Sequence, residues 1–292
     1  MLKHGWEEGR IPERVVVLGS SGFVASAAVQ ALEAAGGQVN AVGSGELDLT
    51  SESAGTSLAE RLDGTDVLVF VAAKAPCKDS ATLMLNLRMA EAVHTALQAI
   101  PVSQLIYISS DAVYSGEPSL IDESTPCAPE SMHGMMHSVR EMMASHATEQ
   151  SVCILRPSLL YGAADPHNGY GPNRFRRLAS AGEVIKLFGE GEEMRDHVLI
   201  DDVAELIRLC AFHRSNGVLN VATGVSTSFR DAAERTAALF AEPVEVLGSP
   251  RQNPITHVHY NNTAVSKAFP HFRFTELSEG LRKTHELALS PA

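Results

Sequence analysis

The stretch "RVVVLGSSGFVASAAVQALEAAGG" constrains the fold most strongly, because it joins an apolar run to a helix through a glycine turn. The run Val15–Leu18 is apolar without alternation, which indicates a strand buried on both faces, as in a parallel sheet. The alanine-rich helix that follows ends at Gly36 and Gly37. The stretch therefore predicts the first unit of a βαβ series.

The glycine turn "GSSGFVAS" has the features of a phosphate-binding turn. Gly19 allows the tight turn, Gly22 lets a pyrophosphate approach the backbone, and the helix N-terminus supplies amide donors. Ala25 stands in place of a third glycine. An acidic ribose ligand is expected at the end of the second strand, but Gly43 and Ser44 stand there, with no arginine for a 2′-phosphate. The sequence therefore predicts NAD or NADP, and we favour NAD.

Strand-like runs and helices continue to alternate through the N-terminal half of the chain. Strands are expected at 38–42, 66–73, 104–110 and 151–158, and helices at 80–99 and 131–147. This alternation predicts a doubly wound parallel α/β sheet. A loop rich in glycine, proline and asparagine follows, and then shorter elements: helices at 175–181, 201–213 and 229–240, and a strand at 184–188.

This change of pattern predicts three parts. Residues 1–13 form an N-terminal tail, and residues 14–160 form a dinucleotide-binding domain. Residues 161–292 form mainly a substrate-binding lobe, with some segments returning to the main sheet. The binding crevice is expected at the carboxyl ends of the strands.

Composition excludes some partners. The net charge is −12, so general attraction to nucleic acid or to an anionic membrane is not expected. The apolar content of 45% supports a substantial core, but no apolar run approaches the ~20 residues that cross a bilayer. The four cysteines make no C-x-x-C pair and the N-terminus has no apolar leader, so we expect a cytoplasmic protein without disulfides.

The stretch "ESMHGMMHSVREMM" places His133 and His137 one helical turn apart, on the same face. The pair is compatible with packed core residues, with a metal pair assisted by the neighbouring methionines, or with acid–base chemistry. No spaced third ligand is evident, so no metal is predicted. A neutral imidazole accepts a proton near neutral pH, and two adjacent imidazoles disfavour double protonation.

Several segments together resemble the extended short-chain dehydrogenase/reductases, the NAD-dependent epimerase/dehydratase group that acts on nucleotide sugars. The resemblance covers about residues 14–285. It rests on Gly19-x-x-Gly22-Phe23, on Asn86, and on "LDLT", "VAAKA", "YISSDAVYSG", "LRPSLLYG", "RDHVLIDDVAELI" and "VLNVATGVSTSFRDAA". It implies a Rossmann-type sheet with a small C-terminal α/β substrate lobe.

The chain departs from this family at the catalytic dyad. The family has a serine with the tyrosine and lysine of Y-x-x-x-K, and here His133 and His137 stand at the last two positions. The resemblance implies that Ser110 polarises the substrate oxygen, that His133 is the acid or base, and that His137 bonds the nicotinamide ribose. The loss of both dyad members leaves open a relic that binds a dinucleotide without catalysis.

The resemblance also implies binding residues. Cofactor contacts are expected at Gly19, Ser20, Ser21, Gly22, Phe23, Val24, Asp48, Leu49, Ala72, Ala73, Lys74, Asn86, Ser109, His137 and Pro157. Substrate contacts are expected at Lys74, Ser110, Asp111, Asn173, Arg174, Arg195 and Arg251, where arginines suit a diphosphate. Arg176 and Arg177 are expected on a solvated helix face.

The function implied is an NAD(P)-dependent epimerase, or a 4-ketoreductase or dehydrogenase, acting on a nucleotide sugar. A dehydratase acid is present at Asp111, but Ala112 replaces the neighbouring glutamate, which argues against a 4,6-dehydratase. The alternative is a catalytically degenerate NAD(P)-binding regulatory or scaffold protein. A homodimer formed through the helices at 80–99 and 131–147 is expected.

Overall fold

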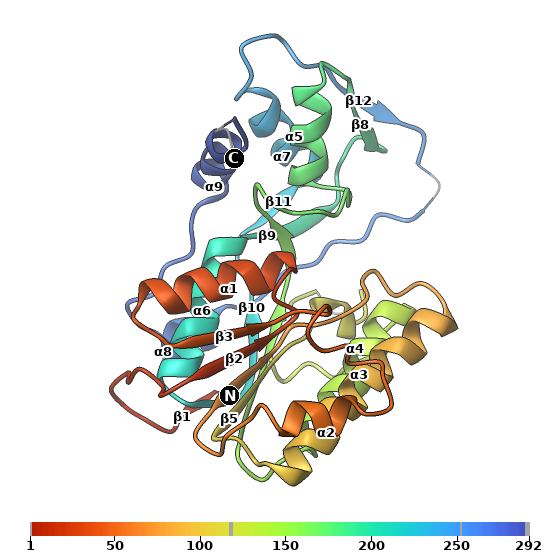
Figure 1. Ribbon diagram of the computed structural model, residues 1–292. Helices are drawn as coiled ribbons and strands as arrows, with labels where there is room; N and C mark the ends of the chain where they lie inside the picture. The colour runs from red at the N-terminus through yellow and green to blue at the C-terminus, as the bar shows by residue number, and fades with distance from the viewer. Residues whose placement is uncertain (1, 117–118, 252, 290–292) are drawn as a thin grey trace.

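The computed structural model describes residues 2–116, 119–251 and 253–289, and a seven-stranded sheet lies at its centre (Figure 1). The strand order is β1-β10-β6-β5-β4-β2-β3, and every pairing is parallel except that of β1 with β10. The strands are β1 Lys3–His4, β2 Val15–Leu18, β3 Val39–Val42, β4 Val67–Phe70, β5 Gln104–Ile108, β6 Ser151–Pro157 and β10 Ser215–Val221. The predicted doubly wound sheet is confirmed.

Helices cover both faces of this sheet (Figure 1). One face carries α1 Phe23–Ala34, α6 Ile200–Phe212 and α8 Thr263–Ala268; the other carries α2 Ala54–Ala59, α3 Ser80–Ala99 and α4 Met132–Ser145. In β2, Val15 and Val17 join one core cluster, and Val16 and Leu18 join the other. Burial on both faces explains why this strand shows no polar alternation.

A smaller lobe lies above the main sheet in the view of Figure 1. It holds a three-stranded sheet, β11-β9-β7, and a two-stranded sheet, β12-β8. Its elements are β7 Leu159–Tyr161, α5 Pro172–Ser180, β8 Ile185–Phe188, β9 Met194–Leu199, β11 Ser226–Ser228, α7 Phe229–Ala237, β12 Val246–Ser249 and α9 Leu277–Leu289. Phe175, Leu187 and Phe229 pack together in its own core.

Two of the predicted strands end two or more residues earlier than the sequence suggests, and the residues that follow them line the crevice described below. Strand β4 ends at Phe70. The amides of Val71 and Ala72 still donate to the Leu18 carbonyl of β2, and residues 71–74 form part of the crevice wall. Strand β5 ends at Ile108, and the short helix η1 Asp111–Val113 follows. Within the described ranges, no helix has the length and apolarity needed to span a membrane.

Candidate active site

A crevice of about 870 Å³ lies at the carboxyl ends of the parallel strands. Its walls come from the turns after β2, β3, β4 and β5, from β6, and from the loop that leads into α5. The predicted cofactor residues that line it are Gly19, Ser21, Gly22, Phe23, Val24, Asp48, Leu49, Ala72, Ala73, Lys74, Ser109, His137 and Pro157. Ser20 and Asn86 are not among the lining residues.

The glycine turn has the shape that a dinucleotide requires. Gly19 has a φ of +95°, and a Cβ there would lie 2.8 Å from Cα of Ala72. Gly22 precedes α1 without a side-chain cap, so the first amides of this helix stay open toward the crevice. These open donors lie beside two residues without side chains, Gly19 and Gly22, and so fit a pyrophosphate.

Asn86 and Asp48 shape the crevice in different ways. Asn86 is fully buried and holds Lys74, accepting from its backbone N–H at 2.9 Å and donating to its carbonyl at 3.0 Å. Asp48 lines the crevice and accepts from the hydroxyl and amide of Thr50, which lowers its carboxyl pKa. Lys74 is the sole lysine or arginine among the described lining residues.

Ser110 lines the crevice at the start of η1. Its Oγ accepts from the Ala112 amide and donates to the Asp111 carboxylate, each at 3.2 Å. Asp111 itself lies behind this wall, where Tyr260 donates to it at 3.0 Å and burial raises its pKa. The structure therefore presents the Ser110 hydroxyl, but not the predicted Asp111 carboxylate, to the crevice.

Helix α4 brings His133 to this wall through a close approach at Gly134. A Cβ at Gly134 would lie only 1.9 Å from the Ala112 carbonyl oxygen, so the first turn of α4 packs directly on η1. Ser131 caps the helix by accepting from the Gly134 amide at 3.1 Å. His133 lines the crevice, and its Nδ1 accepts a long bond, 3.4 Å, from the Cys77 amide.

His137 lies deeper on the same helix face. Its Nδ1 is 2.7 Å from the Tyr107 hydroxyl, and its ring meets His133 edge to face, with centroids 4.8 Å apart. Burial lowers the pKa of both histidines, and the nearby Arg140 guanidinium lowers both further. In the described part of the chain, no group of three or more His, Cys, Asp or Glu side chains is placed to hold a metal ion.

Two residues that the sequence analysis missed support this pair from behind, Tyr107 and Arg140. Arg140 is buried, donates to the Ala72 carbonyl at 2.7 Å, and lies 4.3 Å over the Phe70 ring and 5.2 Å over the Tyr107 ring. Spacing was the available signal: Arg140 follows His137 by three residues on a helix, and Tyr107 precedes Ser109 by two on a strand.

The predicted substrate residues are only partly brought together. Lys74, Ser110 and Asn173 line the crevice, whereas Asp111, Arg174, Arg195 and Arg251 do not. Asn173 is already engaged, donating to Asp165 at 2.6 Å and accepting from the Gly162 amide at 3.0 Å. It therefore braces the loop at the crevice mouth.

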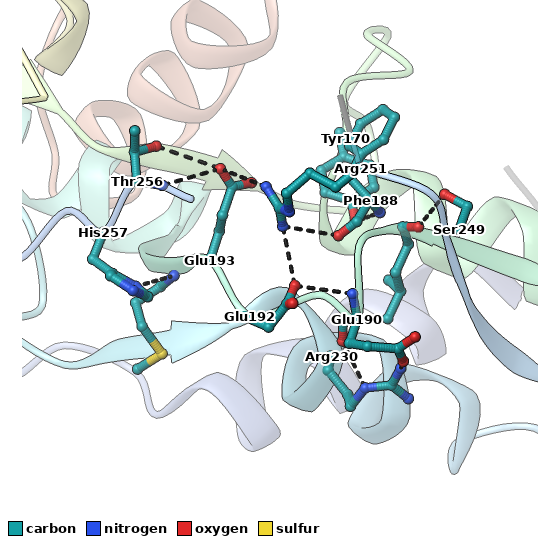
Figure 2. Close-up of polar contacts among 12 residues, drawn as sticks. Tyr170, Phe188, Glu190, Glu192, Glu193, Arg230, Ser249, Arg251, Thr256 and His257 are labelled. Carbon is teal, nitrogen blue, oxygen red and sulfur yellow. Dashed lines mark hydrogen bonds and ion pairs between the residues drawn. The ribbon is translucent and has the colours of Figure 1, made fainter. Parts of the chain in front are cut away.

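Two expected phosphate-binding arginines also bind within the protein. Arg195 donates to the Thr256 carbonyl at 2.6 Å and to its hydroxyl at 2.9 Å. Figure 2 shows the Arg251 guanidinium beside Glu192 and Glu193, at 3.1 and 3.3 Å. Any anionic substrate has to compete with these partners for the guanidinium groups.

Arg176 and Arg177, expected on a solvated face, instead donate to carbonyls of the loop before α5. Arg176 reaches the carbonyl of Ala163 at 3.5 Å, and Arg177 reaches that of His167 at 2.8 Å. These bonds tie the loop that forms one wall of the crevice to helix α5.

Comparison with known proteins gives relatives of two activities. The chain is 28% identical over 215 residues to a UDP-glucose 4-epimerase of Mycolicibacterium smegmatis, covering 69% of this chain and 66% of the relative. It is 30% identical over 217 residues to a 2-alkyl-3-oxoalkanoate reductase of Shewanella oneidensis, covering 64% and 54%. The chain thus spans less than two thirds of the length of these curated relatives.

Solved structures agree in fold over nearly the whole chain. The UDP-glucose 4-epimerase of Thermus thermophilus, solved in complex with NAD, has a TM-score of 0.82 at 23% identity, covering 94% of this chain and 98% of that one. An epimerase of Methanothermobacter thermautotrophicus has a TM-score of 0.83 at 17% identity, covering 94% and 92%. Residues 15–222 match the description "NAD dependent epimerase/dehydratase family", and the chain belongs to that family.

Proposed function

We propose that this protein binds NAD, rather than NADP, in the crevice and catalyses hydride transfer at a carbinol or carbonyl carbon of a nucleotide sugar, as an epimerase or a 4-ketoreductase. One observation carries the proposal: a single crevice is lined by the Gly19 turn, Ser110, His133 and His137. Family membership and the NAD complex of the Thermus structure support it. No arginine that could bind a 2′-phosphate is found among the described lining residues, which favours NAD.

The residues of the chain divide the chemistry between them. A bound nicotinamide supplies or takes up the hydride. The Ser110 hydroxyl holds the substrate oxygen, and His133 takes the hydroxyl proton as the carbinol is oxidised, or returns it on reduction. Because burial lowers the pKa of His133 below 6.5, the proton-accepting form predominates at neutral pH.

The tautomer of His133 sets a condition on this step. While Nδ1 accepts from the Cys77 amide, a neutral ring carries its proton on Nε2. A free Nε2 lone pair becomes available when the proton moves to Nδ1 and the contact with Cys77 is released. At 3.4 Å this contact is at the long end of hydrogen bonding, so its release costs little.

His133→Ala tests the proposal. We expect turnover to fall by about 10²- to 10⁴-fold while NADH still binds, because the variant removes proton transfer and leaves the glycine turn intact. A panel of UDP- and GDP-sugars is tested. Epimerisation, which returns the hydride to the sugar, is followed by chromatography of the sugar products, and oxidation or reduction is followed by the absorbance of reduced nicotinamide. In the oxidative direction, the wild-type rate should fall as pH drops through the lowered pKa of His133.

His146→Ala is the matched control, because His146 lies at the exposed end of the same helix. It should leave both turnover and the pH profile unchanged. The proposal fails if no sugar nucleotide changes the absorbance of bound cofactor at any pH, or if His133→Ala retains full activity.

A second candidate is a non-catalytic, NAD-dependent regulatory protein of the same fold. The engagement of Arg195 by Thr256, and of Arg251 by Glu192 and Glu193, favours it, because a diphosphate finds no free guanidinium at these positions. Under this candidate, NADH binds without turnover and changes the affinity for a protein partner.

A further inference from the structure

The Tyr107 hydroxyl and His137 Nδ1 form a buried hydrogen bond of 2.7 Å. Burial raises the pKa of Tyr107 and lowers the pKa of His137, so both groups are neutral and the phenol keeps its proton. One proton therefore lies between the two side chains. If the phenol donates it, the imidazole proton of His137 is on Nε2; if Nδ1 donates it, Nε2 is bare.

The surroundings of Tyr107 determine the direction of this bond. Its ring is packed against Phe70, with centroids 5.5 Å apart, and against the guanidinium of Arg140, which has donors only. Among the described residues, the hydroxyl has no hydrogen-bond partner other than His137. If Nδ1 of His137 were the donor, the phenol proton would be buried without an acceptor. The phenol therefore donates to Nδ1.

The opposite ring nitrogen of His137 faces the crevice. A neutral imidazole that accepts at Nδ1 carries its proton on Nε2. No bond from Nε2 to another described residue is found, yet this atom is not sealed from solvent, and His137 lines the crevice. The N–H is thus free to donate to a ligand.

We propose that Tyr107 is a positioning residue that locks His137 as the Nε2–H tautomer, so that the position of the family's lysine presents a neutral N–H donor to the cofactor ribose. The ribose contact rests on the proposed function; the locked tautomer does not. A lysine at this position would carry a positive charge beside the ribose. In this protein the nearby positive charge is that of Arg140, which lies behind the Tyr107 ring and lowers the pKa of His137 without touching the ribose.

Histidine-selective ¹⁵N NMR reads the tautomer directly, and His137→Gln assigns the signals. In the wild type, His137 should show a protonated Nε2 and a bare Nδ1 across the neutral range. In Tyr107→Phe, Nδ1 loses its donor, and the spectrum should shift toward a mixture of the two tautomers. Tyr161→Phe is the control, because the buried Tyr161 hydroxyl has no partner in the described structure and lies outside the crevice lining.

Cofactor affinity tests whether Tyr107 acts through His137. Tyr107→Phe should weaken NADH binding by about three- to tenfold, as expected for a misplaced hydrogen-bond donor. In the His137→Gln background, the same substitution should have no further effect. A structural role of Tyr107 would instead weaken binding equally in both backgrounds.

Two results would overturn the inference: a proton on Nδ1 of His137 in the wild type, or a spectrum unchanged by Tyr107→Phe. An equal loss of affinity in both backgrounds would also refute the positioning role. If NADH does not bind at all, the proposed function and the ribose contact fail, while the tautomer measurement still decides the part played by Tyr107.

Discussion

His197 shows how far burial decides the charge of single side chains in this protein. The ring is 3% exposed, and neither nitrogen has a hydrogen-bond partner in the described structure. Burial, with a smaller contribution from Arg195, lowers its pKa to about 4. The residue fills space in the smaller lobe against Phe229, with ring centroids 5.7 Å apart, and serves no catalytic role in our proposal.

His197→Phe should therefore stabilise the protein, most strongly in acid. The unfolded chain protonates this histidine near pH 6.5 and the folded chain near 4, so folding stability falls as pH drops between these values. At about 1.4 kcal/mol per pH unit, the wild type loses about 3 kcal/mol that the variant keeps. Urea unfolding at neutral pH and in mild acid measures this difference.

The exposed His271 provides the control for this experiment, because His271→Phe leaves the interior unchanged. An equal acid loss in wild type and in His197→Phe would show that the ring is hydrated or paired in solution.

At the scale of elements, the register of α4 on β5 places the site. Tyr107 and Ser109 lie two residues apart on one face of the strand and its extension, and His137 and Glu141 lie one turn apart on the helix. Tyr107 bonds His137, and Ser109 bonds Glu141 at 2.5 Å. Arg156 of β6 then binds Glu141 at 2.6 and 2.9 Å and anchors the helix over the sheet.

Gly134→Ala should disturb this register. The added methyl group would lie 1.9 Å from the Ala112 carbonyl oxygen, so α4 has to move away from η1. We expect a loss of about 1–3 kcal/mol in the free energy of unfolding, as is usual when a packed site is overfilled. We also expect kcat to fall, because His133 moves with α4 away from Ser110. Thermal unfolding and turnover measure the two effects.

Gly64→Ala is the matched control, because its new methyl group would meet nothing closer than the Pro101 carbonyl oxygen, at 3.7 Å. A Gly134→Ala protein as stable and as active as Gly64→Ala would contradict the close packing of α4 on η1.

Elements with local signals could be predicted from the sequence, and long-range partners could not. Helix α3 has the bounds predicted for it, because the Asp79 side chain caps it, accepting from the Thr82 amide at 2.7 Å, and Pro101 follows. The partners of Arg195 and Arg251 lie about sixty residues away in the chain. No pattern near an arginine reveals that residues from a distant segment engage it.

At the scale of the whole molecule, the two parts share secondary structure. Helix α6 and strand β10 come from the C-terminal half, yet α6 packs on α1, and β10 lies between β1 and β6 of the main sheet. The boundaries at residues 13 and 160 therefore remain predictions of which part of the chain binds the cofactor and which part binds the substrate. The sequence predicts the class of fold, a doubly wound parallel sheet. It does not predict that α6 and β10 in particular join this sheet, because that depends on tertiary packing.

A homodimer through α3 and α4 remains our expectation, and exposed methionines supply its test. Met84, Met132, Met135 and Met142 are 52%, 37%, 47% and 67% exposed on these helices. These side chains lie on two helices that pack against each other, and an apolar patch formed across both helices would favour an interface. Met135→Glu combined with Met142→Glu should convert a dimer to a monomer in sedimentation equilibrium.

The control for the dimer is Leu287→Glu on α9, which is 55% exposed and distant in sequence from both helices. It should leave the mass unchanged. A monomeric wild type at micromolar concentration would refute the dimer.

The short strand β1 has a consequence for handling the protein. Lys3 and His4 pair antiparallel with Asn216 and Ser215, and so cover the edge of β10 at its first two residues. The His4 ring also forms hydrogen bonds with the Ser215 hydroxyl and with the Ala268 carbonyl, each at 2.9 Å. Removal of the residues up to His4 would expose this edge of β10, and strands of other molecules could pair with it. A purification tag should therefore be added outside this segment and should not replace it.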